Sequence, residues 1–93
     1  MTITWDETKR AKTLAERGLD FADAAEVFRG DQFTRRDERY SYGEARYITA
    51  GYVGARFVVI VWTPRGNNRR IISMRFGHER EEKHYATQMG RSG

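Results

Sequence analysis

The sequence predicts an α+β fold: a curled antiparallel sheet with two N-terminal helices on one face, followed by a C-terminal helix. Three observations predict it. Residues 56–63, RFVVIVWT, are β-branched and aromatic, which is typical of a central strand. Residues 21–28, FADAAEVF, place apolar side chains at i, i+3, i+4 and i+7, the spacing of one helix face. Short connections between the later strands favour antiparallel hairpins.

The predicted elements follow one another in the order β-α-α-β-β-β-β-α. Asp6 is placed to cap the first helix and Gly18 to end it. Glycine and asparagine residues after Pro64 mark the turn of the last hairpin. The strands are expected at 2–5, 32–36, 44–50, 56–63 and 69–76, and the helices at 7–17, 21–28 and 78–89. We expect one domain over residues 1–89 and a frayed tail at 90–93.

The register of the last hairpin decides which arginines share a face of the sheet. The expected pairs are Trp62 with Ile71, Ile60 with Ser73, and Val58 with Arg75. These residues would then share one face, and the other face would carry Arg70, Ile72 and Met74. A slip of one residue would exchange the two faces, because side chains alternate along a strand.

Basic residues are concentrated in the second half of the chain. The formal net charge is +4, and residues 46–75 hold six arginines and no acidic residue. Arginine forms planar, bidentate contacts with phosphate or carboxylate. This half of the chain therefore suggests a polyanion or an acidic protein as partner. A solvated basic surface would have the same composition.

Composition also excludes several kinds of protein. The chain has no cysteine, which excludes disulfides and thiolate metal sites. No apolar run approaches the roughly 20 residues of a membrane span, and the N-terminus lacks a signal-peptide core. We therefore expect a soluble cytoplasmic protein. His78 and His84 lack the spacing of a metal site, and no phosphate-binding glycine loop is present.

Arg75, Glu81 and Tyr85 form one candidate constellation. Arg75 lies near a strand end, and Glu81 and Tyr85 lie four residues apart on the next helix, so the three could converge on a groove. Arginine can hold a phosphate, and tyrosine can stack on a base or transfer a proton. The alternative is structural, with Tyr85 packed over the sheet and Glu81 paired with Arg75.

Other aromatic residues alternate with arginines along the chain, which suits either binding of single-stranded nucleic acid or a tightly filled core. These residues are Tyr40, Tyr42, Tyr47, Tyr52 and Trp62.

Three stretches together resemble one known family. Residues 5–28 begin WDETK and end GLDFADAAEVF, and residues 44–51 read EARYITAG. Residues 69–75 read RRIISMR, ahead of Glu81 and Tyr85. This order and spacing is similar to that of the BrnT-type toxins of bacterial type II toxin–antitoxin systems, from about residue 3 to residue 86.

The resemblance implies a RelE-like ribonuclease fold and an endoribonuclease that inhibits translation. It implies a cognate BrnA-like antitoxin whose ribbon-helix-helix domain lets the complex bind operator DNA, and it allows a homodimer within that complex. Our hypothesis for the reaction needs no metal. The RNA 2′-hydroxyl attacks the phosphate, arginines stabilise the transition state, and a tyrosine or histidine transfers the proton. The competing hypothesis is a non-catalytic module whose basic face binds RNA or the antitoxin.

Some residues that match the family pattern are expected to support the fold, and others are expected to take part in the reaction. We expect the catalytic residues to be Lys9, Arg46, Arg70, Arg75 and Tyr85. We expect the RNA-binding residues to be Arg17, Arg56, Arg69 and Ser73. The family usually has Lys-His before Gly18, where this chain has Glu16 and Arg17. Arginine is a cation with no acceptor nitrogen, so Arg17 can bind phosphate but is a poor general base.

Overall fold

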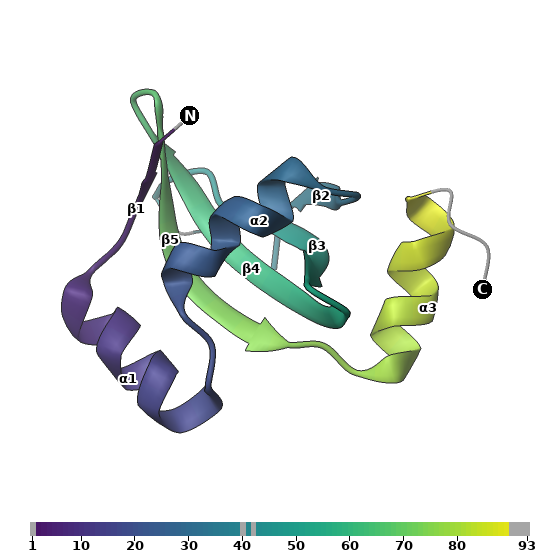
Figure 1. The fold of residues 1–93 in the computed structure, drawn as a ribbon. Coiled ribbons are helices and arrows are strands. Elements are labelled where there is room, and N and C mark those ends of the chain that lie inside the picture. The colour runs from purple at the N-terminus through teal and green to yellow at the C-terminus, as the bar shows by residue number, and fades with distance from the viewer. Residues whose placement is uncertain (1, 40, 42, 90–93) are drawn as a thin grey trace.

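The structure, a computed structural model, describes residues 2–39, 41 and 43–89, so the tail expected at 90–93 lies outside the described residues, as do Tyr40 and Tyr42. Within these residues the chain forms five strands and three helices (Figure 1). The strands are β1 (Thr2–Thr4), β2 (Phe33–Arg36), β3 (Tyr47–Val53), β4 (Arg56–Arg65) and β5 (Asn68–Phe76). The helices are α1 (Glu7–Arg17), α2 (Ala24–Arg29) with a 3₁₀ turn η1 (Phe21–Asp23) before it, and α3 (Glu79–Gln88).

The five strands form one mixed sheet in the order β1-β5-β4-β3-β2. Neighbouring strands from β2 to β5 are antiparallel, as the short connections predict. β1 instead runs parallel to β5, with Thr2 beside Asn68 and Thr4 beside Arg70. The expectation of a wholly antiparallel sheet is therefore wrong at the first strand. Strands joined by a short connection pair as antiparallel hairpins. β1 is not constrained in this way, because two helices and three strands separate it from β5 along the chain.

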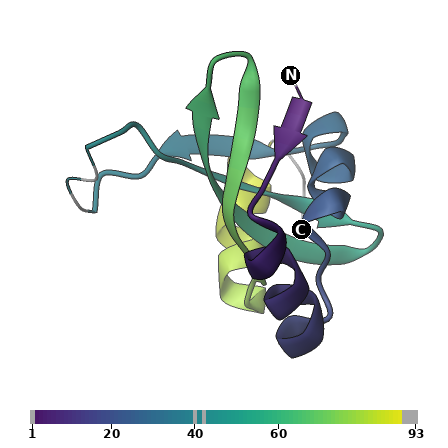
Figure 2. The same cartoon turned by 90° about the vertical axis from the view of Figure 1, so that its left-hand side faces the viewer.

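Helices lie on both faces of the sheet (Figure 2). On the α2 face, the core consists of Leu19, Phe21, Ala24, Val27, Val58, Ile60, Trp62, Ile71 and Met74. On the α3 face, it consists of Ile48, Ala50, Phe57, Val59 and Tyr85. β4 contributes alternate side chains to both clusters, which explains its continuous apolar sequence. The helix α1 lies beside β5 and contacts η1, so both N-terminal helices lie on the α2 side, as expected (Figure 1).

A β-bulge changes the register of the last hairpin. The pairs that form are Trp62 with Ile71, Val61 with Ser73, Ile60 with Met74, Val59 with Arg75, and Val58 with Phe76. Only the first of the three expected pairs is correct. The other two are wrong because Ile72 is an extra residue opposite the Val61/Trp62 step. The bulge places Ser73 and Arg75 on the α3 face and leaves Met74 in the core of the α2 face.

The helix α1 is held by its ends and by an arginine, because none of its residues is buried. Asp6 accepts hydrogen bonds from two backbone N–H groups of the first turn at 2.8 and 3.2 Å, and Gly18 ends the helix with φ of 70°. Both caps were predicted. Arg10 then joins the helix to the rest of the fold through two hydrogen bonds of 2.8 Å to Asp20.

The strand β3 spans Tyr47–Val53 rather than the expected 44–50. Gly51 therefore lies within the strand, where a Cβ would lie 2.7 Å from Val27 Cγ1. The glycine lets α2 cross β3 closely. The turn between β3 and β4 follows at Gly54, whose φ is 60°. No helix in the described part of the chain is long and apolar enough to cross a membrane.

Candidate active site on the α3 face

Tyr85 is the centre of the arrangement on the α3 face. Its ring lies 5.9 Å from that of Phe33 and 6.0 Å from that of Phe57, and the residue is only 6% exposed. These contacts fix the side chain on the sheet, as the structural interpretation of Tyr85 expects. Its hydroxyl nevertheless reaches a polar partner, because Arg35 Nε donates to it at 3.3 Å. The ring therefore belongs to the core while the hydroxyl faces Arg35.

Arg75 and Glu81 form the pair that the structural alternative expected. Arg75 Nη1 donates to Glu81 Oε1 at 2.9 Å and Nη2 donates to Oε2 at 2.7 Å. The hydrogen bonds from Arg75 lower the pKa of Glu81 to about 2, and the same pair raises the pKa of Arg75. Glu81 also accepts from the backbone N–H of His78 at 3.0 Å, at the start of α3. The carboxylate thus fixes the guanidinium at the junction between β5 and α3.

Arg35 is the residue that sequence reasoning missed. It lies on β2, where Phe33 pairs with Ala50 and Arg35 pairs with Ile48, both on the α3 face. A weak signal was present in the sequence. Phe33 marks the core-facing side of a short strand, and Arg35, two residues later, must lie on the same side. The strand was expected, but its faces were not assigned.

A hollow opens beside these side chains. Its lining residues are Arg35, His78, Arg80, Glu81, His84 and Tyr85. The ring of His84 lies 5.3 Å from that of Tyr85 in an edge-on arrangement. The hollow thus offers guanidinium groups for an anion and both a phenol and an imidazole for proton transfer.

Three more of the expected residues lie on the same face, farther along the sheet. Ser73 pairs with Val61, and Arg70 pairs with Thr63, which places both on the α3 face. Arg46 lies two residues before Ile48 of this face and contacts Glu44, with 3.5 Å between Nε and Oε2. With Arg75 and Tyr85, five of the nine expected residues therefore share one face of the sheet.

The other four expected residues lie elsewhere. Lys9 is exposed on α1. Arg17 Nη1 donates to the backbone carbonyl of Met74 at 2.9 Å, which ties α1 to β5. Arg56 lies over the ring of Phe76 with its Cζ 3.8 Å from the centroid. Arg69 lies on the α2 face, so the structure does not bring these four to the Tyr85 hollow.

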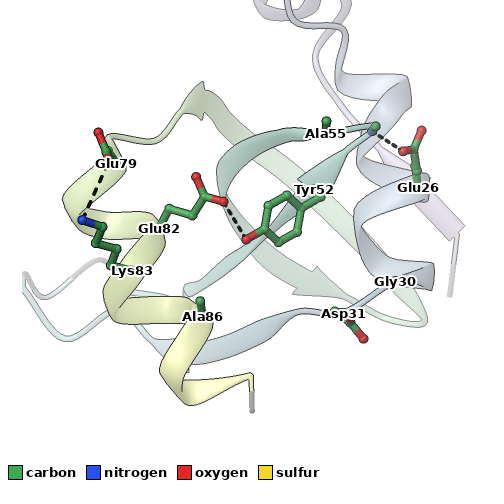
Figure 3. A pocket seen from close by; sticks show the side chains of 10 residues that line it. Glu26, Gly30, Asp31, Tyr52, Ala55, Glu79, Glu82, Lys83 and Ala86 are labelled. Atoms are coloured by element: carbon green, nitrogen blue, oxygen red, sulfur yellow. Dashed lines mark hydrogen bonds and ion pairs between the residues drawn. The ribbon is translucent and has the colours of Figure 1, made fainter. Parts of the chain in front are cut away.

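A second hollow lies between α2, the β3–β4 turn and α3 (Figure 3). Its charged lining residues are mostly acidic: Glu26, Asp31, Glu79, Glu82 and Lys83. The hydroxyl of Tyr52 donates to Glu82 at 2.9 Å across it. Carboxylates repel phosphate, so this hollow does not suit a nucleic-acid backbone. Among the described residues, no group of three or more histidine or acidic side chains is arranged to hold a metal ion.

Comparisons with known proteins identify the family of the chain. The family model described as the ribonuclease toxin BrnT of type II toxin–antitoxin systems matches residues 5–81. The crystal structure of the Brucella abortus ribonuclease toxin BrnT matches with a TM-score of 0.65 at 30% sequence identity. That match covers 85% of this chain and 99% of the Brucella chain. A search of curated proteins finds no significant match. The chain belongs to the BrnT family of ribonuclease toxins of type II toxin–antitoxin systems.

Proposed function

We propose that the protein is a metal-independent endoribonuclease of RelE-like type whose active site is the Tyr85 hollow. The observation that carries the proposal is the contact of Arg35 with the Tyr85 hydroxyl in an open hollow, beside the Glu81 carboxylate that holds Arg75 on the same face. These side chains come from β2, β5 and α3, so only the folded chain assembles them. Family membership supports RNA as the substrate.

The proposed reaction is an internal transesterification of RNA. The 2′-oxygen forms a bond to the adjacent phosphorus, and the bond from phosphorus to the 5′-oxygen breaks. The proton of the 2′-hydroxyl leaves to a base, and a proton is delivered to the departing 5′-oxygen. The products are a 2′,3′-cyclic phosphate and a 5′-hydroxyl. All atoms balance without water, an oxidant or a metal ion.

The side chains in the hollow and on the sheet face beside it have distinct roles in this reaction. Arg35 and Arg75 stabilise the negative charge that accumulates on the phosphate oxygens in the transition state. Because Glu81 neutralises part of the charge of Arg75, Arg35 supplies the larger share of the electrostatic stabilisation. Tyr85 and His84 provide the groups that transfer protons. Arg46, Arg70 and Ser73 extend the same face along the RNA chain.

The partner in this proposal is a BrnA-like antitoxin that neutralises the toxin. Membership of a type II system supports an antitoxin protein that binds the toxin directly. The arginines on the α3 face of the sheet are complementary to an acidic segment, which would cover the same side chains that RNA uses. Operator DNA would be bound through the ribbon-helix-helix domain of the antitoxin, in a complex that holds one or two toxin chains.

A second candidate function is a non-catalytic module that binds RNA or the antitoxin through the same face. Two observations favour it. Arg17, where the family usually has histidine, donates to the carbonyl of Met74 and so has a structural contact. In addition, Arg75 already holds a carboxylate in the place where a phosphate would bind.

One cleavage experiment separates the two functions. Purified protein is incubated with end-labelled single-stranded RNA in the presence of EDTA, and the product ends are identified. Tyr85→Phe removes the hydroxyl while keeping the packed ring, and Arg35→Gln removes an exposed guanidinium. We expect each to lower the cleavage rate by about 100-fold or more, at an unchanged melting temperature. Lys12→Gln, an exposed change on α1, is the charge-matched control and should cleave normally.

The outcomes are distinct. Cleavage that survives EDTA and is lost in Tyr85→Phe or Arg35→Gln supports the nuclease. RNA binding without cleavage at high protein excess supports the module. Cleavage that EDTA abolishes rules out the metal-independent reaction, and cleavage by both variants at the wild-type rate rules out this hollow as the active site.

A further inference from the structure

The strand β2 forms an edge of the sheet and carries two consecutive arginines. Arg35 pairs with Ile48 and reaches Tyr85 on the α3 face. Arg36 pairs with Tyr47 and lies on the opposite face, because successive side chains of a strand alternate. Arg36 therefore lies across the β2 edge from the Tyr85 hollow.

Beyond Arg36, a row of aromatic side chains continues across the α2 face. Tyr47 pairs with Arg36 on one side and with Trp62 on the other. The rings of Tyr47 and Trp62 are stacked, with centroids 5.1 Å apart and planes inclined by 28°. Trp62 is only 7% exposed, whereas Tyr47 is half-buried. Trp62 thus supports the ring of Tyr47 from below, and Tyr47 presents aromatic surface to solvent.

Arg69 adds a second guanidinium to this row. Its Cζ lies 4.0 Å from the ring centroid of Phe28 and 5.2 Å from that of Trp62. Phe28 in turn meets Trp62 edge-on at 5.7 Å. The aromatic rings hold the guanidinium flat against the sheet. Arg69 Nε is buried and has no hydrogen-bond partner among the described residues, so packing rather than an acidic side chain fixes its position.

We propose that Arg36, Tyr47 and Arg69 form a second RNA-binding surface, reached over the β2 edge from the Tyr85 hollow. The ligand class is single-stranded RNA, bound by base stacking on Tyr47 and by phosphate contacts to the two arginines. Aromatic platforms between cationic groups are the usual means of binding single strands without strong sequence preference. This surface rests on the proposed function, since it binds the part of the same RNA that lies outside the hollow.

The pairing of stacking surface with guanidinium favours RNA over an acidic protein as the occupant. A carboxylate-rich peptide would be held by the arginines alone, whereas a nucleobase also uses the exposed ring of Tyr47. The geometry further requires a flexible single-stranded RNA, because the RNA must bend around β2 to reach both faces of the sheet. A duplex is too stiff for that path.

The test uses a non-cleavable probe, so that binding is measured apart from catalysis. A fluorescent 2′-O-methyl RNA of about 16 nucleotides is titrated with the protein, and its anisotropy is recorded over a range of salt concentrations. We expect Tyr47→Val to weaken binding by about fivefold or more and Tyr47→Phe to retain it. Arg36→Gln should lower the slope of log Kd against log salt by about 0.7, the value for one phosphate contact on a single strand.

Lys12→Gln on α1 is the control for loss of one positive charge, and its salt slope should match that of the wild type. Wild-type affinity and slope in both Tyr47→Val and Arg36→Gln would overturn the proposal. If Tyr47→Val fails to fold, Arg36→Gln decides alone, because its side chain is exposed. If the wild-type protein cleaves RNA but both variants bind the probe normally, the second RNA-binding surface is rejected and the nuclease function stands. If the variants weaken binding but the wild-type protein does not cleave RNA, the nuclease function is rejected and the second RNA-binding surface stands.

Discussion

Arg75 and Glu81 form a bidentate ion pair of 2.7 and 2.9 Å that joins the end of β5 to the first turn of α3. The pair is partly exposed, since 43% of the Arg75 side chain and 29% of the Glu81 side chain remain accessible. The bidentate geometry makes it stronger than an ordinary surface pair. Its position also fixes α3, and with it Tyr85, over the sheet.

The first prediction concerns the dependence of stability on pH. The pKa of Glu81 is about 2 in the folded protein, below the ordinary value of 4.5, chiefly because Arg75 donates hydrogen bonds to it. A lowered pKa means that the stabilisation is complete above pH 4.5 and is lost as pH falls from there towards 2. Glu81→Gln should therefore lower the Tm by about 4–8 °C near pH 6, equivalent to about 1 kcal/mol.

This difference in Tm should shrink steadily when the melts are repeated down to pH 2. Glu79→Gln is the matched control, because Glu79 lies in the same first turn of α3 and pairs only loosely with Lys83 at 3.7 Å. It shares the effect of the helix dipole but lacks the bidentate pair. A gap between wild type and Glu81→Gln that stays constant from pH 6 to pH 2 would contradict the assigned role of the carboxylate.

The second prediction concerns a chain of polar groups on the α2 face that runs from the buried Trp62 and Thr49 to the exposed Thr34. Trp62 Nε1 donates to Thr49 Oγ1 at 2.8 Å, and the hydroxyls of Thr49 and Thr34 lie 2.7 Å apart. Thr49 is fully buried. Thr49→Val keeps the shape but leaves the indole N–H without a partner, so it should cost about 1–3 kcal/mol in urea denaturation. Thr49→Ser keeps the hydroxyl, and a loss as large as that of valine would point to packing instead.

The third prediction tests the close crossing of α2 and β3. A methyl group at position 51 would lie 2.7 Å from Val27 Cγ1 and 3.3 Å from the carbonyl oxygen of Asp31. Gly51→Ala should therefore lower the free energy of unfolding by about 1–3 kcal/mol. In a Val27→Ala background the clash with Cγ1 is removed. The same glycine change should then cost less, and strictly additive effects would exclude this contact as the cause.

Local signals in the sequence predicted most elements of the fold correctly. The α1 boundaries depend on Asp6 and Gly18, which act within one turn of the helix. β4 was equally clear, because its apolar run faces two cores. The parallel pairing of β1 had no comparable local signal, since it depends on where the rest of the chain returns. Pairing between segments far apart in the chain is set by the whole fold.

The candidate site was only partly predictable for the same reason. Arg75, Glu81 and Tyr85 are close in the sequence, and a strand followed by a helix brings them together. The face expected for Arg75 was wrong, because the bulge at Ile72 shifts the register without a distinctive residue in the sequence. Arg35 was missed because it is 50 positions from Tyr85, and only the pairing of β2 with β3 brings the two together.

The last prediction concerns α1, which buries none of its residues and so depends on few contacts. Arg10 donates to both carboxylate oxygens of Asp20 at 2.8 Å and to Glu7 at 2.7 Å. The bonds to Asp20 lower the pKa of that carboxyl group. Arg10→Gln should release the helix locally. Its amide hydrogens should exchange much faster, while those of the central strand β4 keep their protection.

Hydrogen exchange followed by mass spectrometry of peptides from α1 and β4 would measure this difference. Lys12→Gln, two residues away and exposed, removes the same charge without removing a contact to Asp20 and should leave both peptides unchanged. Equal acceleration in α1 and β4 would mean that Arg10 supports the whole fold rather than the helix. Unchanged exchange in α1 would show that Arg17, bonded to the Met74 carbonyl, is enough to hold it.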